Sequence, residues 1–168
     1  MNLNTTSRED LLTQGSDARF RQMVYDLFTI STHMQSVRDH VASRIGISGP
    51  QYSILMAIAE MQNDVGVSVK RVAEHLHVSG AFVTVESGKL LKLGYLEKRP
   101  NPEDRRGVRL TLSAKGAEET RLVLPELCQI NDVFFGGLGK NAFEVLADIA
   151  AGMITPAEEA LRKTTGSE

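Results

Sequence analysis

Side chains that can bind phosphate are concentrated between Ser68 and Thr111. Arginine and lysine bind phosphate oxygens as charged donors, and hydroxyl groups donate to phosphates or to base edges. This chemistry predicts a surface that contacts double-stranded DNA. The candidate contact residues are Ser68, Ser79, Thr84, Ser87, Lys89, Arg105, Arg106 and Arg109.

The charge of this segment differs from that of the rest of the chain. Residues 68–112 contain nine Lys and Arg against five Asp and Glu, although the net charge of the 168 residues is −2. The segment therefore has an excess of four positive charges, and the remainder has an excess of six negative ones. Because local charge governs attraction to phosphate, a basic module on an acidic body is compatible with DNA binding.

Two short helices are expected within the basic segment. Ser68 and Ser79 are each placed to cap one of them, and Gly94 can end the second in a left-handed conformation. The apolar positions expected to face the core are Val69, Val72, Ala73 and Leu76, then Phe82, Val83, Leu90, Leu91 and Leu93. Two short helices joined by a tight turn predict a helix-turn-helix, whose second helix fits a DNA major groove. The polar residues of that helix, from Ser79 to Lys89, are expected on the face opposite the core.

A β-hairpin is expected to follow the second helix. Strand-forming residues at 95–99 and 108–111 flank the turn sequence Pro-Asn-Pro-Glu-Asp-Arg-Arg-Gly at 100–107. A basic hairpin tip can reach a minor groove or its phosphates. Asp104 is the candidate wing-shaping residue, because its carboxylate can pair with a neighbouring arginine. The alternative is a solvated charged hairpin without DNA contact.

The hairpin and its continuation, Leu-Thr-Leu-Ser-Ala-Lys-Gly at 110–116, resemble the wing region of the MarR-type bacterial transcriptional regulators. The segments Ile-Ser-Gly-Pro-Gln-Tyr at 47–52 and Val-Ala-Glu-His-Leu-His-Val at 72–78 also match the family pattern, and the resemblance covers roughly residues 18–161. It implies a homodimeric repressor that binds a pseudo-palindromic operator. One departure is Val85, which follows Thr84 where the family usually has arginine, so a different sequence preference is expected.

Long amphipathic helices are expected on both sides of the basic segment. Apolar periodicity predicts helices over 18–44 and 113–134, with a kink or break at Pro125, and a last helix that a capping box of Asn141 and Glu144 would start. A chain of this length has little else against which to bury these faces, so they are expected to hold a homodimer. A two-fold dimer would place two second helices about 34 Å apart, one DNA turn.

The expected fold is mainly α with a small β-hairpin wing: a winged helix-turn-helix plus a helical dimerisation lobe. The expected parts are a flexible N-terminal segment (1–17), the dimerisation lobe (18–46 and 113–163) and the DNA-binding domain (47–112). No apolar run approaches twenty residues and no signal-peptide pattern is present, so a cytoplasmic protein without membrane contact is expected. The single cysteine, Cys128, is expected to be a small core residue and not a redox sensor.

The resemblance also implies an effector, a small aromatic carboxylate or phenol that releases the repressor from DNA. Arginine or histidine would pair with the carboxylate, and the other side chains would clamp the ring. Ordinary core or interface packing is the alternative for each residue. The candidate ligand-binding residues are Arg19, Phe28, His33, Met34, Tyr52 and Met56.

Two other functions remain open. A metal-sensing repressor would need His and carboxylate groups brought together by the fold; His75 and His77, two residues apart on a helix, lie on different faces. A winged-helix DNA-binding protein without an effector would have no pocket. No cofactor is expected, and the sequence has no phosphate loop, paired-cysteine site or nucleophile elbow, so an enzyme is not expected.

Overall fold

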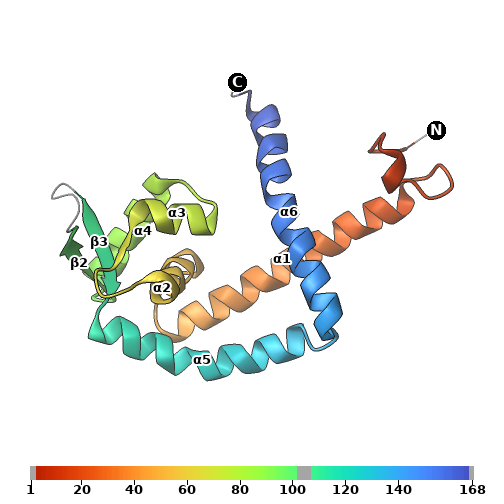
Figure 1. Cartoon of the computed structure of the whole chain (residues 1–168). Coiled ribbons are helices and arrows are strands. Elements are labelled where there is room, and N and C mark those ends of the chain that lie inside the picture. Colours follow the sequence, from red (N-terminus) through yellow and green to blue (C-terminus); the bar gives the residue numbers. More distant parts are fainter. Residues whose placement is uncertain (1–2, 102–106, 167–168) are drawn as a thin grey trace. The chain divides into compact units, whose positions relative to one another are not determined.

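The computed structural model describes residues 3–101 and 107–166, and its contacts divide the chain into two units, residues 1–127 and 128–168. Helices make up most of both units, and one small antiparallel sheet belongs to the first (Figure 1). The elements of the first unit are η1 (Glu9–Leu11), α1 (Ala18–Arg44), α2 (Gly49–Met61), β1 (Val67–Ser68), α3 (Val69–Leu76), α4 (Gly80–Lys92), β2 (Leu96–Pro100), β3 (Val108–Leu112) and most of α5 (Ala114–Phe134). The second unit contains the end of α5 and α6 (Lys140–Thr165).

The helix starts in the first unit follow the capping residues of the sequence. Ser48 begins α2 with a capping box: its Oγ accepts from the Gln51 backbone N–H at 3.4 Å, and Gln51 Oε1 accepts from the Ser48 N–H at 3.1 Å. Ser68 and Ser79 cap α3 and α4 by accepting from backbone N–H groups at 3.3 and 3.1 Å. Side-chain oxygens thereby satisfy donors that have no partner within the helix. The caps predicted at Ser68 and Ser79 are confirmed.

Helices α2, α3 and α4 pack around a common apolar core. His77, in the left-handed region at φ +53°, ends α3 and allows the tight turn into α4. The fully buried side chains of this core are Ile54, Leu55, Ile58, Val72, Val83 and Leu90. The expected core face of α4 is partly wrong, because Phe82 and Leu93 are exposed while Glu86 and Ser87 are buried. Positions 83, 86, 87 and 90 follow the helical period, and residue 82 lies about 100° from residue 83 around the axis.

The hairpin of β2 and β3 is joined by a third strand that periodicity did not predict. The β2–β3 register runs from Leu96 opposite Leu112 to Pro100 opposite Val108, and β1 pairs with the other edge of β3. Strand β1 has two residues, too few to show an alternating pattern. Before β1, Gly66 at φ +83° comes so close to the Leu110 carbonyl that a Cβ would lie 2.7 Å from it. The hairpin tip, including Asp104, Arg105 and Arg106, lies outside the described residues.

The N-terminal segment is more organised than the expected flexible tail. The Asp17 side chain is fully buried and accepts hydrogen bonds from the Thr5 backbone N–H and, at 2.9 Å, from the Thr5 hydroxyl. Arg21 of α1 forms an ion pair with Asp17 and donates to the Leu3 carbonyl at 3.0 Å. The hydrogen bond from the Thr5 backbone is the main cause that holds the Asp17 pKa below its ordinary value. A segment without apolar periodicity is therefore tied to α1 by the side chains of Asp17 and Arg21.

The structure differs from two expectations about the C-terminal helices. Helix α5 continues through Pro125, so the break that was one of the two expected effects of this residue does not occur, since one proline removes a single backbone donor. Helix α6 begins after Gly139, and no side chain caps it, so the capping box expected from Asn141 and Glu144 is wrong. No residue of α6 is buried in the chain. Its exposed large apolar residues include Phe143, Leu146, Ile149, Met153 and Leu161.

Among the residues that the structure describes, none of the helices combines the length and the hydropathy needed to cross a membrane.

Candidate nucleic-acid interface

Helix α4 presents one side to solvent. The turn at His77 and the Ser79 cap set where the helix starts, and its buried face fixes which side points outward. Ser79 and Ser68 use their oxygens as acceptors for backbone N–H groups, which leaves each hydroxyl proton able to donate to a phosphate. The exposed residues of α4 include Ala81, Phe82, Thr84, Val85, Lys89 and Lys92.

Ser87 does not belong to this outer face. Its side chain is buried, and its hydroxyl donates to the Thr84 carbonyl at 3.3 Å. The residue lies four positions after Val83 and three before Leu90, both fully buried, so the helical period places it in the core stripe. The expectation that Ser87 faces away from the core is therefore wrong.

Two outward polar groups of α4, those of Thr84 and Lys89, have partners within the protein. The Thr84 hydroxyl donates to the Gly80 carbonyl at 2.8 Å, and Lys89 Nζ donates to Glu86 Oε1 at 2.7 Å. Gln51 Nε2 donates to the other Glu86 oxygen at 3.1 Å. The hydrogen bond from Lys89 is the main cause that lowers the Glu86 pKa. The sequence analysis did not identify Glu86 as part of the site. Its position on the buried face of α4, with Lys89 three residues later, indicates that the carboxylate has a partner.

Arg109 braces the base of the hairpin. Its Nε donates to Asn101 Oδ1 at 3.2 Å, and its Nη1 donates to the Gly66 carbonyl at 3.4 Å. The side chain therefore links β3 to the other arm of the hairpin and to the turn before β1. These bonds give Arg109 a structural role at the base of the hairpin, beside the DNA contact expected for it.

Two of the six effector candidates lie together in a groove of the first unit. The groove, of about 630 Å³, is formed by α2, α3 and α5 and has a largely apolar wall. The hydroxyls of Tyr52 and Thr120 are buried there without a hydrogen-bond partner among the described residues. Burial raises the Tyr52 pKa, so the phenol stays protonated. The lining residues are Tyr52, Ser53, Met56, Ala57, Ala59, Glu60, His75, Leu76, Thr120, Leu124 and Leu127.

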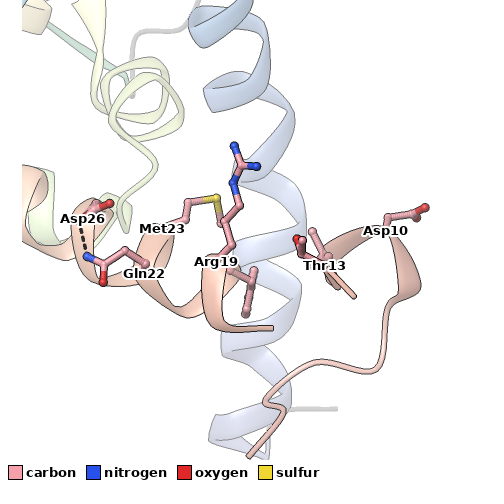
Figure 2. A pocket seen from close by; sticks show the side chains of 8 residues that line it. Asp10, Thr13, Arg19, Gln22, Met23 and Asp26 are labelled. Atoms are coloured by element: carbon pink, nitrogen blue, oxygen red, sulfur yellow. Dashed lines mark hydrogen bonds between the residues drawn. The ribbon is translucent and has the colours of Figure 1, made fainter. Parts of the chain in front are cut away.

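The other effector candidates are separate from this groove. Arg19 lines a second hollow of about 620 Å³ with Asp10 and Thr13 of the N-terminal segment and with Met23 of α1 (Figure 2). Phe28, His33 and Met34 are exposed along α1 and line neither of these two hollows. The structure therefore does not bring the six expected residues into one site. Their spacing along one helix did not show which of them face the rest of the fold.

Two further expectations concern a metal site and the position of Cys128. No three His, Cys, Asp or Glu side chains in the ranges 3–101 and 107–166 are placed to hold a metal ion together. At the rim of the groove His75 Nε2 lies 3.5 Å from Glu60 Oε2. Cys128 is exposed, so its expected place in the core is wrong. It follows Leu127 by one position and so points away from the face that Leu127 occupies on α5.

Comparisons with known proteins agree with this geometry. Residues 45–107 match the model of the MarR family. The HTH-type transcriptional repressor YetL of Bacillus subtilis (strain 168) is 28% identical over 109 residues, which are 65% of this chain and 65% of the relative. The alignment thus spans slightly less than two thirds of that relative's length.

Solved structures share the fold at low sequence identity. A MarR protein from Peptoclostridium difficile has a TM-score of 0.69 at 23% identity over 91% of this chain and 96% of that chain. A MarR regulator from Oenococcus oeni PSU-1 has a TM-score of 0.70 at 20% identity, over 79% and 98%. A mutant MarR from E.coli, complexed with operator DNA, has a TM-score of 0.68 at 18% identity, over 81% and 96%. These matches confirm the family resemblance and the fold class: residues 45–107 match the MarR family model, and the solved structures share the fold.

Proposed function

We propose that the protein is a cytoplasmic DNA-binding transcriptional repressor that acts as a homodimer. The observation that carries this proposal is α4, a capped helix with one buried face and one exposed face, set between a tight turn and a hairpin. This arrangement is that of a helix which enters a major groove while a wing reaches the flanking backbone. The E.coli structure of the same fold, complexed with operator DNA, supports this use of the helix. The proposed role is binding and not catalysis.

Exposed apolar helix faces support the dimer. Met23, Leu27, Ile30 and Met34 are exposed along α1, and the apolar residues of α6 are exposed along that helix. Apolar patches of this extent on a single chain mark interaction surfaces. A two-fold dimer would cover them and place two α4 helices on successive major grooves of a pseudo-palindromic operator.

DNA binding is tested with the full chain and duplexes selected from a random pool. The protein should select a sequence with two related half-sites, and affinity should fall steeply with salt because phosphate contacts release counterions. Arg106→Ala should weaken binding to selected and random duplexes by a similar factor. It should also flatten the slope of log affinity against log salt by about one unit for each lost phosphate contact.

Arg8→Ala, an exposed arginine of the N-terminal segment, is the matched control for the loss of one charge. Failure to select any duplex would exclude the proposed function. An unchanged salt slope with Arg106→Ala would exclude only the role of the wing arginine.

We further propose that a small phenol or aromatic carboxylate binds the groove between α2, α3 and α5. Buried hydroxyls without partners are costly, and a ligand oxygen could bond to both Tyr52 and Thr120 while its ring lies on the apolar wall. His75 at the rim could pair with a carboxylate. The proposed effector site therefore retains Tyr52 and Met56 of the six expected residues and does not include the other four.

Calorimetry with a series of phenols and benzoates tests the effector proposal. Tyr52→Phe should weaken binding while leaving the melting temperature unchanged or higher, because it removes a buried group without a partner. Tyr25→Phe, which changes an exposed tyrosine, should alter neither quantity. The protein would be a DNA-binding regulator without an effector of this class if no compound binds at millimolar concentration.

A further inference from the structure

The outer face of α4 is largely apolar along its first two turns, where a DNA-reading helix is usually polar. Val85 is 57% exposed and Phe82 is 39% exposed, and Ala81 is exposed beside them. Residues three or four apart on a helix are neighbours, so Val85 adjoins both of the others and the three form one surface. The sequence from Ser79 to Val85 contains no charged residue. Val85 also stands where the family resemblance leads one to expect arginine.

Within α4, Thr84, Ser87 and Lys89 each make a hydrogen bond inside the protein. Thr84 gives its hydroxyl proton to the Gly80 carbonyl, so its methyl group and an acceptor oxygen remain for a partner. Ser87 is buried, and the Lys89 ammonium lies 2.7 Å from Glu86. Helix α4 therefore offers a base pair mainly apolar surface along its first two turns.

Thymine provides the apolar group that this surface can recognise in a major groove. Adenine, guanine and cytosine present hydrogen-bonding groups there, whereas thymine also presents its C5 methyl. We propose that α4 selects its DNA sequence through thymine methyl groups, with Val85 as the central contact and Phe82 and Thr84 beside it. This inference rests on the proposed DNA-binding function and specifies the chemistry that the helix reads.

The surroundings of the patch favour DNA over a protein partner. The patch begins at the capped end of α4 and lies on the same helix as Lys89 and Lys92. These side chains, with Lys70 and Arg71 on α3, give the helix pair a positive charge suited to phosphates on either side of a groove. The patch is thus an apolar surface within a basic one, as expected for methyl readout between phosphate contacts.

The experiment uses the full chain and a duplex selected from a random pool. Each thymine is replaced in turn by deoxyuridine, which keeps the hydrogen-bonding edge of thymine and lacks only the C5 methyl. At one or two positions in each half-site, affinity should fall about fourfold, the factor that corresponds to burial of one methyl-sized group. Replacement of cytosine by 5-methylcytosine at the same positions should recover part of the affinity lost on a thymine-to-cytosine change.

Two variants connect this effect to α4. Val85→Ala should bind the thymine duplex more weakly and should no longer distinguish thymine from deoxyuridine at the positions it contacts. Val65→Ala changes a residue of the same type that is 40% exposed in the loop before α3, and it should keep the full fourfold difference.

The possible failures can be told apart. If no duplex is selected, the proposed DNA-binding function is wrong and the inference fails with it. If a duplex is bound with a normal salt dependence but no thymine can be replaced with loss of affinity, the inference alone is overturned. Equal sensitivity of Val85→Ala and of the unchanged protein to deoxyuridine would also overturn it, and would leave the patch to a protein partner.

Discussion

Gln51 Nε2 donates to Glu86 Oε2 at 3.1 Å and so joins the first turn of α2 to the buried side of α4. The same Gln51 side chain completes the capping box of α2 by accepting from the Ser48 backbone N–H. The Gln51 side chain thus caps the start of α2 and also helps to fix the rotation of α4 about its own axis. The side of α4 that faces solvent, proposed to bind DNA, is set by this contact as well as by the apolar core.

Gln51→Ala should lower the free energy of unfolding by about 1–3 kcal/mol. It leaves a buried carboxylate with one donor fewer and removes half of a capping box. Chemical denaturation measures the change. Gln22→Ala is the matched control, since Gln22 bonds to Asp26 on the exposed side of α1 and its loss should cost below about 0.5 kcal/mol. Equal effects of the two variants would contradict the structural role of Gln51.

The Glu86 carboxylate should contribute to the acid sensitivity of the fold. Its pKa is lowered in the folded chain, so the folded state favours the ionised form more than the unfolded state does. The resulting stability is present above the ordinary pKa of 4.5 and is lost as the pH falls through the lower folded value. Glu86→Gln should therefore flatten the dependence of stability on pH below about 4.5.

Denaturation of both proteins between pH 7 and pH 3 measures this difference. Glu74→Gln, which changes an exposed glutamate of α3, should keep the dependence of the unchanged chain. Parallel curves for the Glu86→Gln variant and the unchanged chain would show that Glu86 does not titrate with folding.

Asp17 should hold the N-terminal segment on α1. Asp17→Asn keeps the size of the side chain but removes the charge that pairs with Arg21 and that accepts from Thr5. Amide hydrogen exchange at residues 3–16 should become faster, while exchange in α2–α4 stays unchanged. Asp10→Asn changes an exposed carboxylate and should have no such effect. Unchanged exchange in Asp17→Asn would mean that other contacts hold the segment.

Capping residues in the sequence predicted where helices start, but the sequence did not predict the buried polar contacts between distant residues. Ser48, Ser68 and Ser79 act within three residues of themselves, so their sequence positions suffice to place the starts of α2, α3 and α4. Gln51 and Glu86 are 35 residues apart, and Thr5 and Asp17 belong to a segment without periodicity, so only the folded chain brings them together.

In the candidate site, too, the features set by local sequence were predicted and those set by contacts between distant residues were not. The helix-turn-helix and its hydroxyl residues were predicted from spacing, but the burial of Ser87 depends on the rotation of α4 against α2. The groove at Tyr52 and Thr120 depends on the packing of α5 near α2, which brings together two residues 68 positions apart in the sequence. Periodicity placed Thr120 in a helix but could not show that its hydroxyl, like that of Tyr52, lacks a partner among the described residues.

Helix α6 should form part of the proposed dimer interface. Ile149, 54% exposed in the middle of α6, follows Leu146 by three residues and precedes Met153 by four, so the three make one apolar stripe. Ile149→Glu should leave the helix content unchanged, because the residue has no buried packing within its own chain, and it should dissociate the dimer, because a charge would be buried in the interface. Operator affinity should fall strongly, since a monomer binds a single half-site.

Sedimentation measures the oligomeric state of this variant, and far-UV circular dichroism measures its helix content separately. Val65→Glu adds the same charge at an exposed site of the first unit and should remain dimeric. If Ile149→Glu sediments as a dimer with full affinity for the selected duplex, α6 is not part of the dimer interface.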